Sequence, residues 1–311
     1  MLVLLLCAAA CKGPGRKAPQ QTPDTRSFPM VEVPGAYTDD TDRLDYAGTH
    51  YWDRYLSGTG RTDSACVLGV PRPELEQALA NYIAILDMQE LPAAQKQVEG
   101  FFKGIEGTQQ RLPKADQFYT AITQIVASYL YDPNSPMRDE DLFLPFARGL
   151  AGSRFTRDDM KPAYRYQAMM CELNQRGTVA PDIRARDADG GTFSLHGVKA
   201  PYIILFFSNP GCQACRELME SINSGFSGMV DSGRLAVVNI YIDEDVEAWK
   251  NYAGNYPPKW YNGYDYTHSV RDDVLYDVRA IPSIYLLDGD KRILAKDATI
   301  EKISSLLERA D

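Results

Sequence analysis

Cys212 and Cys215 are the residues of this chain whose type and spacing point most directly to chemistry. A Cys-x-x-Cys pair occurs both in thiol–disulfide exchange sites and as half of a zinc site. Zinc needs four ligands, and a structural site usually takes the other two from a second, closely spaced pair. The remaining candidate ligands beyond the N-terminus are scattered: His50, His196, His268, Cys66 and Cys171. The pair is therefore predicted to be a redox site that needs no metal and no organic cofactor.

The surrounding sequence places this pair where a strand gives way to a helix. Residues 201–208 form a continuous apolar run typical of a strand buried on both faces, and residues 212–230 follow with helical spacing. Unpaired N–H groups and the helix dipole at a helix N-terminus stabilise a thiolate and lower the thiol pKa from its free value of about 8.5. We therefore expect Cys212 to be the nucleophile. Cys215, one turn further in, is expected to be the resolving cysteine.

Length and charge limit the class of protein. The 311 residues are enough for two domains, each with its own core. The net charge of −9 and the lack of a basic stripe argue against nucleic-acid binding, which requires a concentrated Lys/Arg surface. Beyond the N-terminus, no apolar segment reaches the roughly 18–20 residues that span a bilayer. Contact with a membrane is therefore expected only through the N-terminus.

The N-terminus has the pattern of a secretory signal. Residues 2–10 are apolar and end in three alanines directly before Cys11, which resembles a bacterial lipobox. We expect residues 1–11 to be a lipoprotein-type signal peptide ending at a lipidated Cys11, followed by a flexible tether at 12–27. The protein would then face the periplasm from a lipid anchor in the envelope of a Gram-negative bacterium. A plain cleaved signal peptide and a buried N-terminal strand are the alternatives.

The hydrophobic periodicity changes near Gly177. Residues 28–176 place apolar residues at helical spacing and are predicted to form an all-helical domain. From 177 to 311 the spacing is that of strands alternating with helices, in the order β-β-β-α-β-α-β-β-α. The aromatic segment 255–268 is expected to be a loop, which either docks a substrate or packs over the edge of its own domain.

The order of motifs in the second half resembles the thioredoxin superfamily. These motifs are a buried strand, a Cys-x-x-Cys helix, a further strand and helix, and Ile281-Pro282 before a hairpin and a last helix. The segments "APDIRARDADGGTFSL", "FFSNPGCQAC" and "YDVRAIPSIYLLDGDKRIL" are similar to TlpA-like, membrane-anchored thiol–disulfide oxidoreductases. The resemblance implies an α/β thioredoxin-like fold, with Pro282 as the cis-proline and Ile281 as its substrate-facing neighbour. By sequence position alone, Pro282 could also be an ordinary trans proline at a strand edge.

The first half resembles an uncharacterised helical domain found ahead of thioredoxin-like domains in bacterial lipoproteins. The shared segments are "HYWDRY" and "YLYDPNSPMRDEDLFLPF". No activity follows from this resemblance.

The chain departs from thioredoxin itself at two places. Phe206 stands where thioredoxin has a buried aspartate that accepts a proton from the second cysteine, and the spacer is Gln213-Ala214 in place of Gly-Pro. The spacer also lacks the histidine that stabilises the thiolate in strong oxidants. The direction of exchange (reduction, oxidation or isomerisation) therefore stays open. Arg216 is expected to be mainly a solvated helix residue.

These patterns predict a thiol–disulfide oxidoreductase that acts on protein dithiols or disulfides and is recycled by a redox partner. The alternative is a non-catalytic envelope binding lipoprotein whose helical domain engages a partner, with a structural thioredoxin-like domain. A peroxidase is disfavoured, because the Thr/Pro-flanked cysteine and downstream Arg of that chemistry cannot be placed. Cys66 and Cys171 either form a disulfide or remain two separate thiols.

Overall fold

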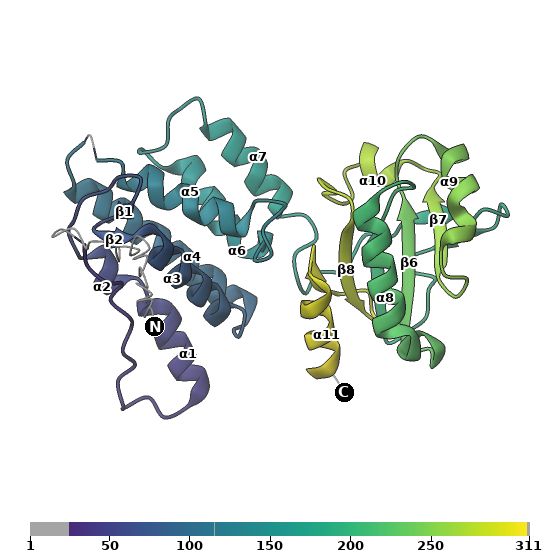
Figure 1. Ribbon diagram of the computed structural model, residues 1–311, viewed down its shortest axis with the longest axis horizontal. Coiled ribbons are helices and arrows are strands. Elements are labelled where there is room, and N and C mark those ends of the chain that lie inside the picture. The colour runs from purple at the N-terminus through teal and green to yellow at the C-terminus, as the bar shows by residue number, and fades with distance from the viewer. Residues whose placement is uncertain (1–24, 115, 310–311) are drawn as a thin grey trace, which may run out of the picture.

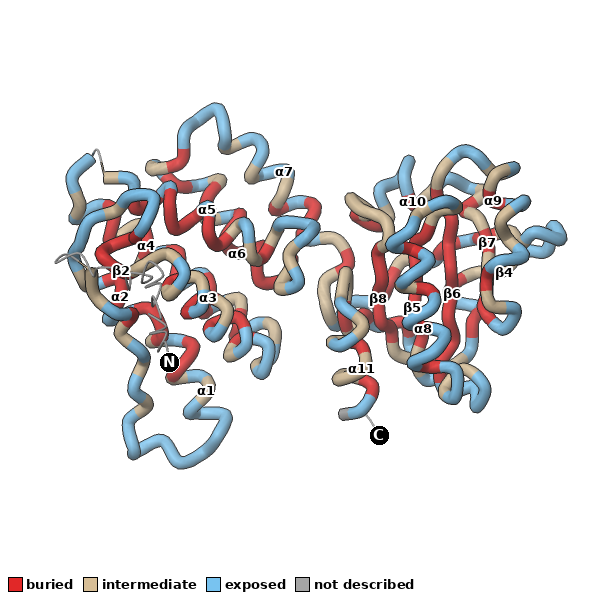
Figure 2. The backbone as a smooth tube through the Cα atoms, viewed as in Figure 1, coloured by how far each residue is buried: buried red, intermediate tan, exposed pale blue. Residues whose placement is uncertain are grey.

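The computed structural model describes residues 25–114 and 116–309. The predicted signal peptide with Cys11, and the predicted tether up to residue 24, lie outside the described residues. Figure 1 shows a helical lobe and a sheet-containing lobe joined by the segment that follows α7. Figure 2 shows that buried residues gather inside each lobe separately. Among the described residues, no helix is both long enough and apolar enough to cross a membrane.

The first lobe is helical, as predicted, with one short addition. Its helices are α1 (Asp40–His50), α2 (Asp53–Leu56), α3 (Arg72–Leu86), α4 (Leu91–Arg111), α5 (Phe118–Leu130), α6 (Glu140–Gly152) and α7 (Lys161–Cys171). The addition is an antiparallel pair, β1 (Cys66–Val67) and β2 (Val70–Pro71). Its turn uses Leu68 and Gly69, both at positive φ. Strands of two residues are too short to produce a periodic pattern, so the prediction of an all-helical domain missed them.

The helical lobe is held by an aromatic core. Helix α4 buries Val98, Phe101 and Ile105, which recur every three or four residues on one face. Trp52 stacks on Phe101 with ring centroids 4.3 Å apart. Fully burying one such side chain stabilises a fold by about 1.5–3 kcal/mol. Arg26, at the end of the predicted tether, donates hydrogen bonds to the carbonyls of Leu68 and Tyr55, so contacts with this lobe begin before Phe28.

The second lobe is a mixed sheet covered on both faces. In the part of the chain that the structure describes, seven strands have the order β4-β3-β7-β6-β5-β8-β9. Their bounds are β3 (Arg184–Arg186), β4 (Thr192–Ser194), β5 (Tyr202–Phe207), β6 (Leu235–Tyr241), β7 (Tyr261–Asp265), β8 (Ser283–Asp288) and β9 (Ile293–Lys296). The helices are α8 (Gln213–Asp231), α9 (Val246–Tyr252), the 3-10 turn η1 (Ala253–Asn255), α10 (Ser269–Asp272) and α11 (Ile300–Arg309). The central strands β5, β6 and β7 are parallel, and β8 runs antiparallel to β5.

Alternating side chains of the central strands enter two cores. Ile203, Leu205 and Phe207 of β5 pack on one face, and Ile204 and Phe206 pack on the other, with α8, α9 and α11. This burial on both faces explains why β5 is a continuous apolar run. The thioredoxin-like α/β architecture predicted from the order of motifs is confirmed.

The segment 255–268, predicted as an aromatic loop, contains the strand β7. β7 pairs in parallel with β6 and antiparallel with β3, and α10 follows it. The buried positions of β7 are Gly263 and Asp265, and neither residue type is typical of a strand. Gly263 has little room for a side chain, because an added Cβ would lie 2.8 Å from the Phe193 ring and 2.9 Å from the Ala185 Cβ.

Candidate functional site

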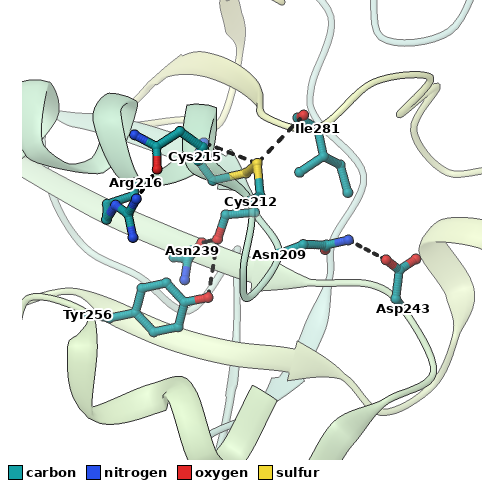
Figure 3. The surroundings of a disulfide bond; sticks show 10 residues. Asn209, Cys212, Cys215, Arg216, Asn239, Asp243, Tyr256 and Ile281 are labelled. Carbon is teal, nitrogen blue, oxygen red and sulfur yellow. Dashed lines mark hydrogen bonds between the residues drawn. A yellow bond between two sulfur atoms is a disulfide. The ribbon is translucent and has the colours of Figure 1, made fainter. Parts of the chain in front are cut away.

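Cys212 is the N-cap residue of α8, at the exit of β5. Its Sγ accepts a hydrogen bond from the backbone N–H of Cys215, at 3.1 Å. The two cysteines form a disulfide with their Cα atoms 5.2 Å apart (Figure 3). A helix N-terminus presents N–H groups that lack partners within the helix, so the sulfur of Cys212 occupies a site suited to negative charge. Once the disulfide is reduced, these groups would stabilise a thiolate at Cys212.

The two sulfur-bearing residues differ in exposure. Cys212 is half-buried, and the spacer residues Gln213 and Ala214 are exposed. Cys215 is buried, with 4% of its surface accessible, in the core that α8 covers. An incoming disulfide can therefore reach Cys212, whereas Cys215 is accessible mainly to the sulfur of Cys212. This division fits the predicted nucleophilic and resolving roles.

The segment that precedes β8 lies beside Cys212. The peptide bond between Ile281 and Pro282 is cis, as the resemblance implies. The carbonyl oxygen of Ile281 lies 3.9 Å from the Sγ of Cys212, although the residues are 69 positions apart in the chain. In the disulfide this sulfur carries no hydrogen, so the approach is a contact; a reduced thiol could donate a weak hydrogen bond there.

Polar residues beneath the loop between β5 and α8 form a group that the sequence analysis missed. The Oγ of Ser208 donates to the Oδ1 of Asn239 on β6, at 2.6 Å, and lies 3.4 Å from the Tyr256 hydroxyl (Figure 3). Burial raises the pKa of Tyr256, so its hydroxyl remains protonated at neutral pH. Asn239 was detectable as the one polar residue within the apolar run "LAVVNIY". Its partners are brought to it only by the fold.

Phe206 is fully buried and paired with Asn239 in the sheet, so its position offers no carboxylate to the site. The ring packs against Trp260, with centroids 6.3 Å apart. The loop between β5 and α8 makes a further contact, in which the side-chain amide of Asn209 donates a hydrogen bond to Asp243 (Figure 3). The position that holds a buried acid in thioredoxin is thus occupied by an apolar ring in this domain.

The other candidate residues lie away from the disulfide or inside the protein. Tyr256 and Trp260 are buried, and Tyr261 on β7 is 42% exposed, so most of the aromatic segment packs within its own domain. Cys66 and Cys171 are buried free thiols within the described residues. In residues 25–114 and 116–309, no three His, Cys, Asp or Glu side chains are arranged to hold a metal ion.

Comparison with known proteins accounts for both lobes. Residues 7–174 match the model of a domain of unknown function, DUF5106, and residues 201–293 match a thioredoxin-like model. A crystal structure of a thioredoxin-like protein from Bacteroides caccae is 31% identical, covers 92% of this chain and 99% of its own, and superposes with a TM-score of 0.73. The chain belongs to the thioredoxin-like family. Its thioredoxin-like domain follows a DUF5106 domain.

Further solved structures cover less than half of this chain. The C-terminal domain of an uncharacterised Bacteroides fragilis protein is 37% identical over 43% of this chain and 98% of its own, with a TM-score of 0.42. The thioredoxin domain of a thiol-disulfide oxidoreductase from Bacteroides vulgatus is 25% identical over 43% and 96%, with a TM-score of 0.39. Among curated proteins, no sequence matches this chain.

Proposed function

We propose that this thioredoxin-like protein is a thiol–disulfide oxidoreductase that exchanges disulfides with protein substrates through Cys212 and Cys215. The observation that carries the proposal is the disulfide at the N-terminus of α8, which has one accessible and one buried sulfur. Ile281 supports it, because its carbonyl borders the accessible sulfur where a substrate backbone would lie.

The reduced protein would act in two displacement steps. The Cys212 thiolate attacks one sulfur of a substrate disulfide, forming a mixed disulfide and releasing the other substrate sulfur as a thiolate. Cys215, deprotonated, then attacks the Sγ of Cys212, which restores the disulfide and releases the second substrate sulfur. Two electrons pass to the substrate, and its two thiolates take up the protons that the two cysteines lose. A dithiol partner must reduce the disulfide again, and a substrate dithiol would drive the same steps in reverse.

The test is the reduction potential of the Cys212–Cys215 pair against glutathione, combined with the reduction of insulin disulfides by the pre-reduced protein. The wild type is expected to exchange, and Cys212→Ser is expected to fall to the rate of the buffer. Cys171→Ala is the matched control: it removes a buried thiol outside the site and is expected to retain the wild-type rate. A wild-type protein whose disulfide exchanges under neither strongly reducing nor strongly oxidising conditions would instead indicate a binding lipoprotein.

We further propose that the protein acts in the bacterial envelope from a lipid anchor at Cys11. The support is the apolar stretch 2–10 directly before that cysteine, together with the polar segment after it. An acyl chain would anchor the protein without a membrane-spanning helix. Cys11→Ser is expected to move the protein from the membrane fraction to the soluble fraction, and unchanged fractionation would contradict the anchor.

Mixed disulfides trapped with Cys215→Ser would identify the substrates.

A further inference from the structure

The boundary between the two lobes holds a cluster of charged side chains that the exchange steps do not use. The DUF5106 lobe contributes Arg138, Asp139, Glu140 and Asp141, and the thioredoxin-like lobe contributes Asp277, Arg279, Lys296 and Asp297. The side chains of Glu140 and Lys296 are only 2% and 4% exposed. Charges that leave water at a domain boundary must be paired, and pairing seldom adds more stability than apolar packing would. The cluster is therefore suited to fixing the position of the residues of one lobe against those of the other.

One side of the cluster holds the segment just before Ile281. Arg279 forms an ion pair with Glu140 and lies over the ring of Tyr131, 4.1 Å from its centroid. Both partners belong to the DUF5106 lobe. Within its own lobe, the Nε of Arg279 lies 3.0 Å from the Oδ2 of Asp277. This guanidinium therefore links the segment that leads to Ile281 and Pro282 to the helical lobe.

The other side holds the residue just after Pro282. The Oγ of Ser283 donates to the Oδ1 of Asp297, at 2.6 Å. The second oxygen of Asp297 accepts a hydrogen bond from Arg138. Arg138 also donates to Glu140, at 3.0 Å. The contacts on both flanks of the Ile281–Pro282 segment thus lead to the same two residues of the helical lobe, Arg138 and Glu140.

Lys296 holds the carboxylate of Glu140 from its other side. Its Nζ lies 3.2 Å from the Oε2 of Glu140, which leaves Oε1 for Arg138 and Arg279. The same ammonium group donates to the carbonyls of Cys171 and Leu173, at 3.2 and 2.9 Å, where α7 ends. Glu140 is therefore held on both of its oxygens.

We propose that Glu140 and Arg138 of the DUF5106 domain are positioning residues that hold the Ile281–Pro282 segment in place beside Cys212. The segment borders the sulfur that attacks, so the helical domain acts as part of the apparatus that docks a protein substrate. This inference rests on the proposed function. It assigns the DUF5106 domain a task at the redox site.

Glu140→Gln in the full-length protein tests the proposal, because it removes the charge and retains the shape. Asp87→Asn is the matched control: Asp87 pairs with Lys302 at the same boundary, at 3.3 Å, and has no described contact with Arg279 or Ser283. With insulin as substrate, Glu140→Gln is expected to raise KM about tenfold, in the range of coupling between contacting residues, with kcat nearly unchanged. Exchange with 2-hydroxyethyl disulfide, which has no peptide backbone to dock, should stay within about twofold of the wild type.

A second readout follows the segment itself. Hydrogen–deuterium exchange of the backbone amides between 278 and 284 is expected to rise in Glu140→Gln and to stay at the wild-type level in Asp87→Asn. Arg279→Gln, at a partly exposed side chain, should give the same kinetic and exchange signature if Glu140→Gln does not fold.

Three results would overturn the inference: equal losses with insulin and 2-hydroxyethyl disulfide, equal effects of Glu140→Gln and Asp87→Asn, or unchanged amide protection in both Glu140→Gln and Arg279→Gln. A wild-type protein that exchanges with neither substrate would overturn the proposed function instead. Hydrogen–deuterium exchange of the amides between 278 and 284 would then be the only test of the positioning role. Increased exchange in Glu140→Gln over Asp87→Asn would uphold it, and equal protection would refute it.

Discussion

Two helices of this protein have a cysteine at one end, and the two ends give opposite chemistry. Cys212 precedes the first turn of α8, where the backbone N–H of Cys215 donates to the sulfur of this partly exposed residue. Cys171 is the last residue of α7, where carbonyl groups face outward and its side chain is fully buried. Burial raises the pKa of Cys171 to about 12. The helix end and the accessibility of the sulfur, more than the residue type, decide which thiol can react.

The largest expected effect is on the rate of alkylation. In the reduced protein at pH 7, iodoacetamide is expected to label Cys212 at least about a thousandfold faster than Cys171. A thiol of ordinary pKa near 8.5 is a few per cent ionised at that pH, whereas one of pKa about 12 is ionised to about one part in 10⁵. Mass spectrometry of peptides from timed samples measures both rates. In urea the two cysteines should react alike, and similar rates in the folded protein would contradict the comparison.

A smaller effect is expected on stability at alkaline pH. Because folding raises the pKa of Cys171 from about 9 to about 12, the folded state favours the protonated thiol. This contribution to stability is complete below pH 9 and is lost as the pH rises towards 12. Between pH 9 and 11, the unfolding free energy of the wild type should fall by about 2 kcal/mol more than that of Cys171→Ala.

Urea unfolding with reductant present, at matched pH values, measures this difference. The buried tyrosines titrate in both proteins, so their contribution cancels. Parallel pH dependences would show that the Cys171 thiol is as easily ionised in the folded state as in the unfolded chain.

The sequence predicted the parts of the fold and the site whose signals are local. β5 and β6 are buried on both faces and are therefore apolar runs, with Asn239 in β6 as the one polar residue. The Cys-x-x-Cys spacing after such a run placed Cys212 at the start of a helix, where it lies. The resemblance to the thioredoxin superfamily added the Ile281–Pro282 segment, which no local pattern distinguishes from an ordinary strand edge.

The sequence did not predict features that depend on distant partners. β7 was missed because the buried carboxylate of Asp265 looks like a loop residue until Val270 and Thr267 donate hydrogen bonds to it. Glu140 was not singled out, because an acidic residue in the first turn is common on any surface helix. Its burial becomes visible only when β9 brings Lys296 across the domain boundary.

The smallest expected effect concerns Arg216, the cation in the first turn of α8. Its guanidinium donates to Gln213, whose amide donates in turn to Glu217, at 2.6 Å, so this surface chain also carries a compensating negative charge. Solvent screens exposed charges strongly, and such a pair contributes at most about 0.5 kcal/mol. Arg216→Gln should therefore slow the alkylation of Cys212 at pH 7 by no more than about twofold, and added salt should remove the difference. A tenfold change that persists in high salt would mean that this arginine, together with the helix N-terminus, stabilises the thiolate, and that helix position alone does not separate Cys212 from Cys171.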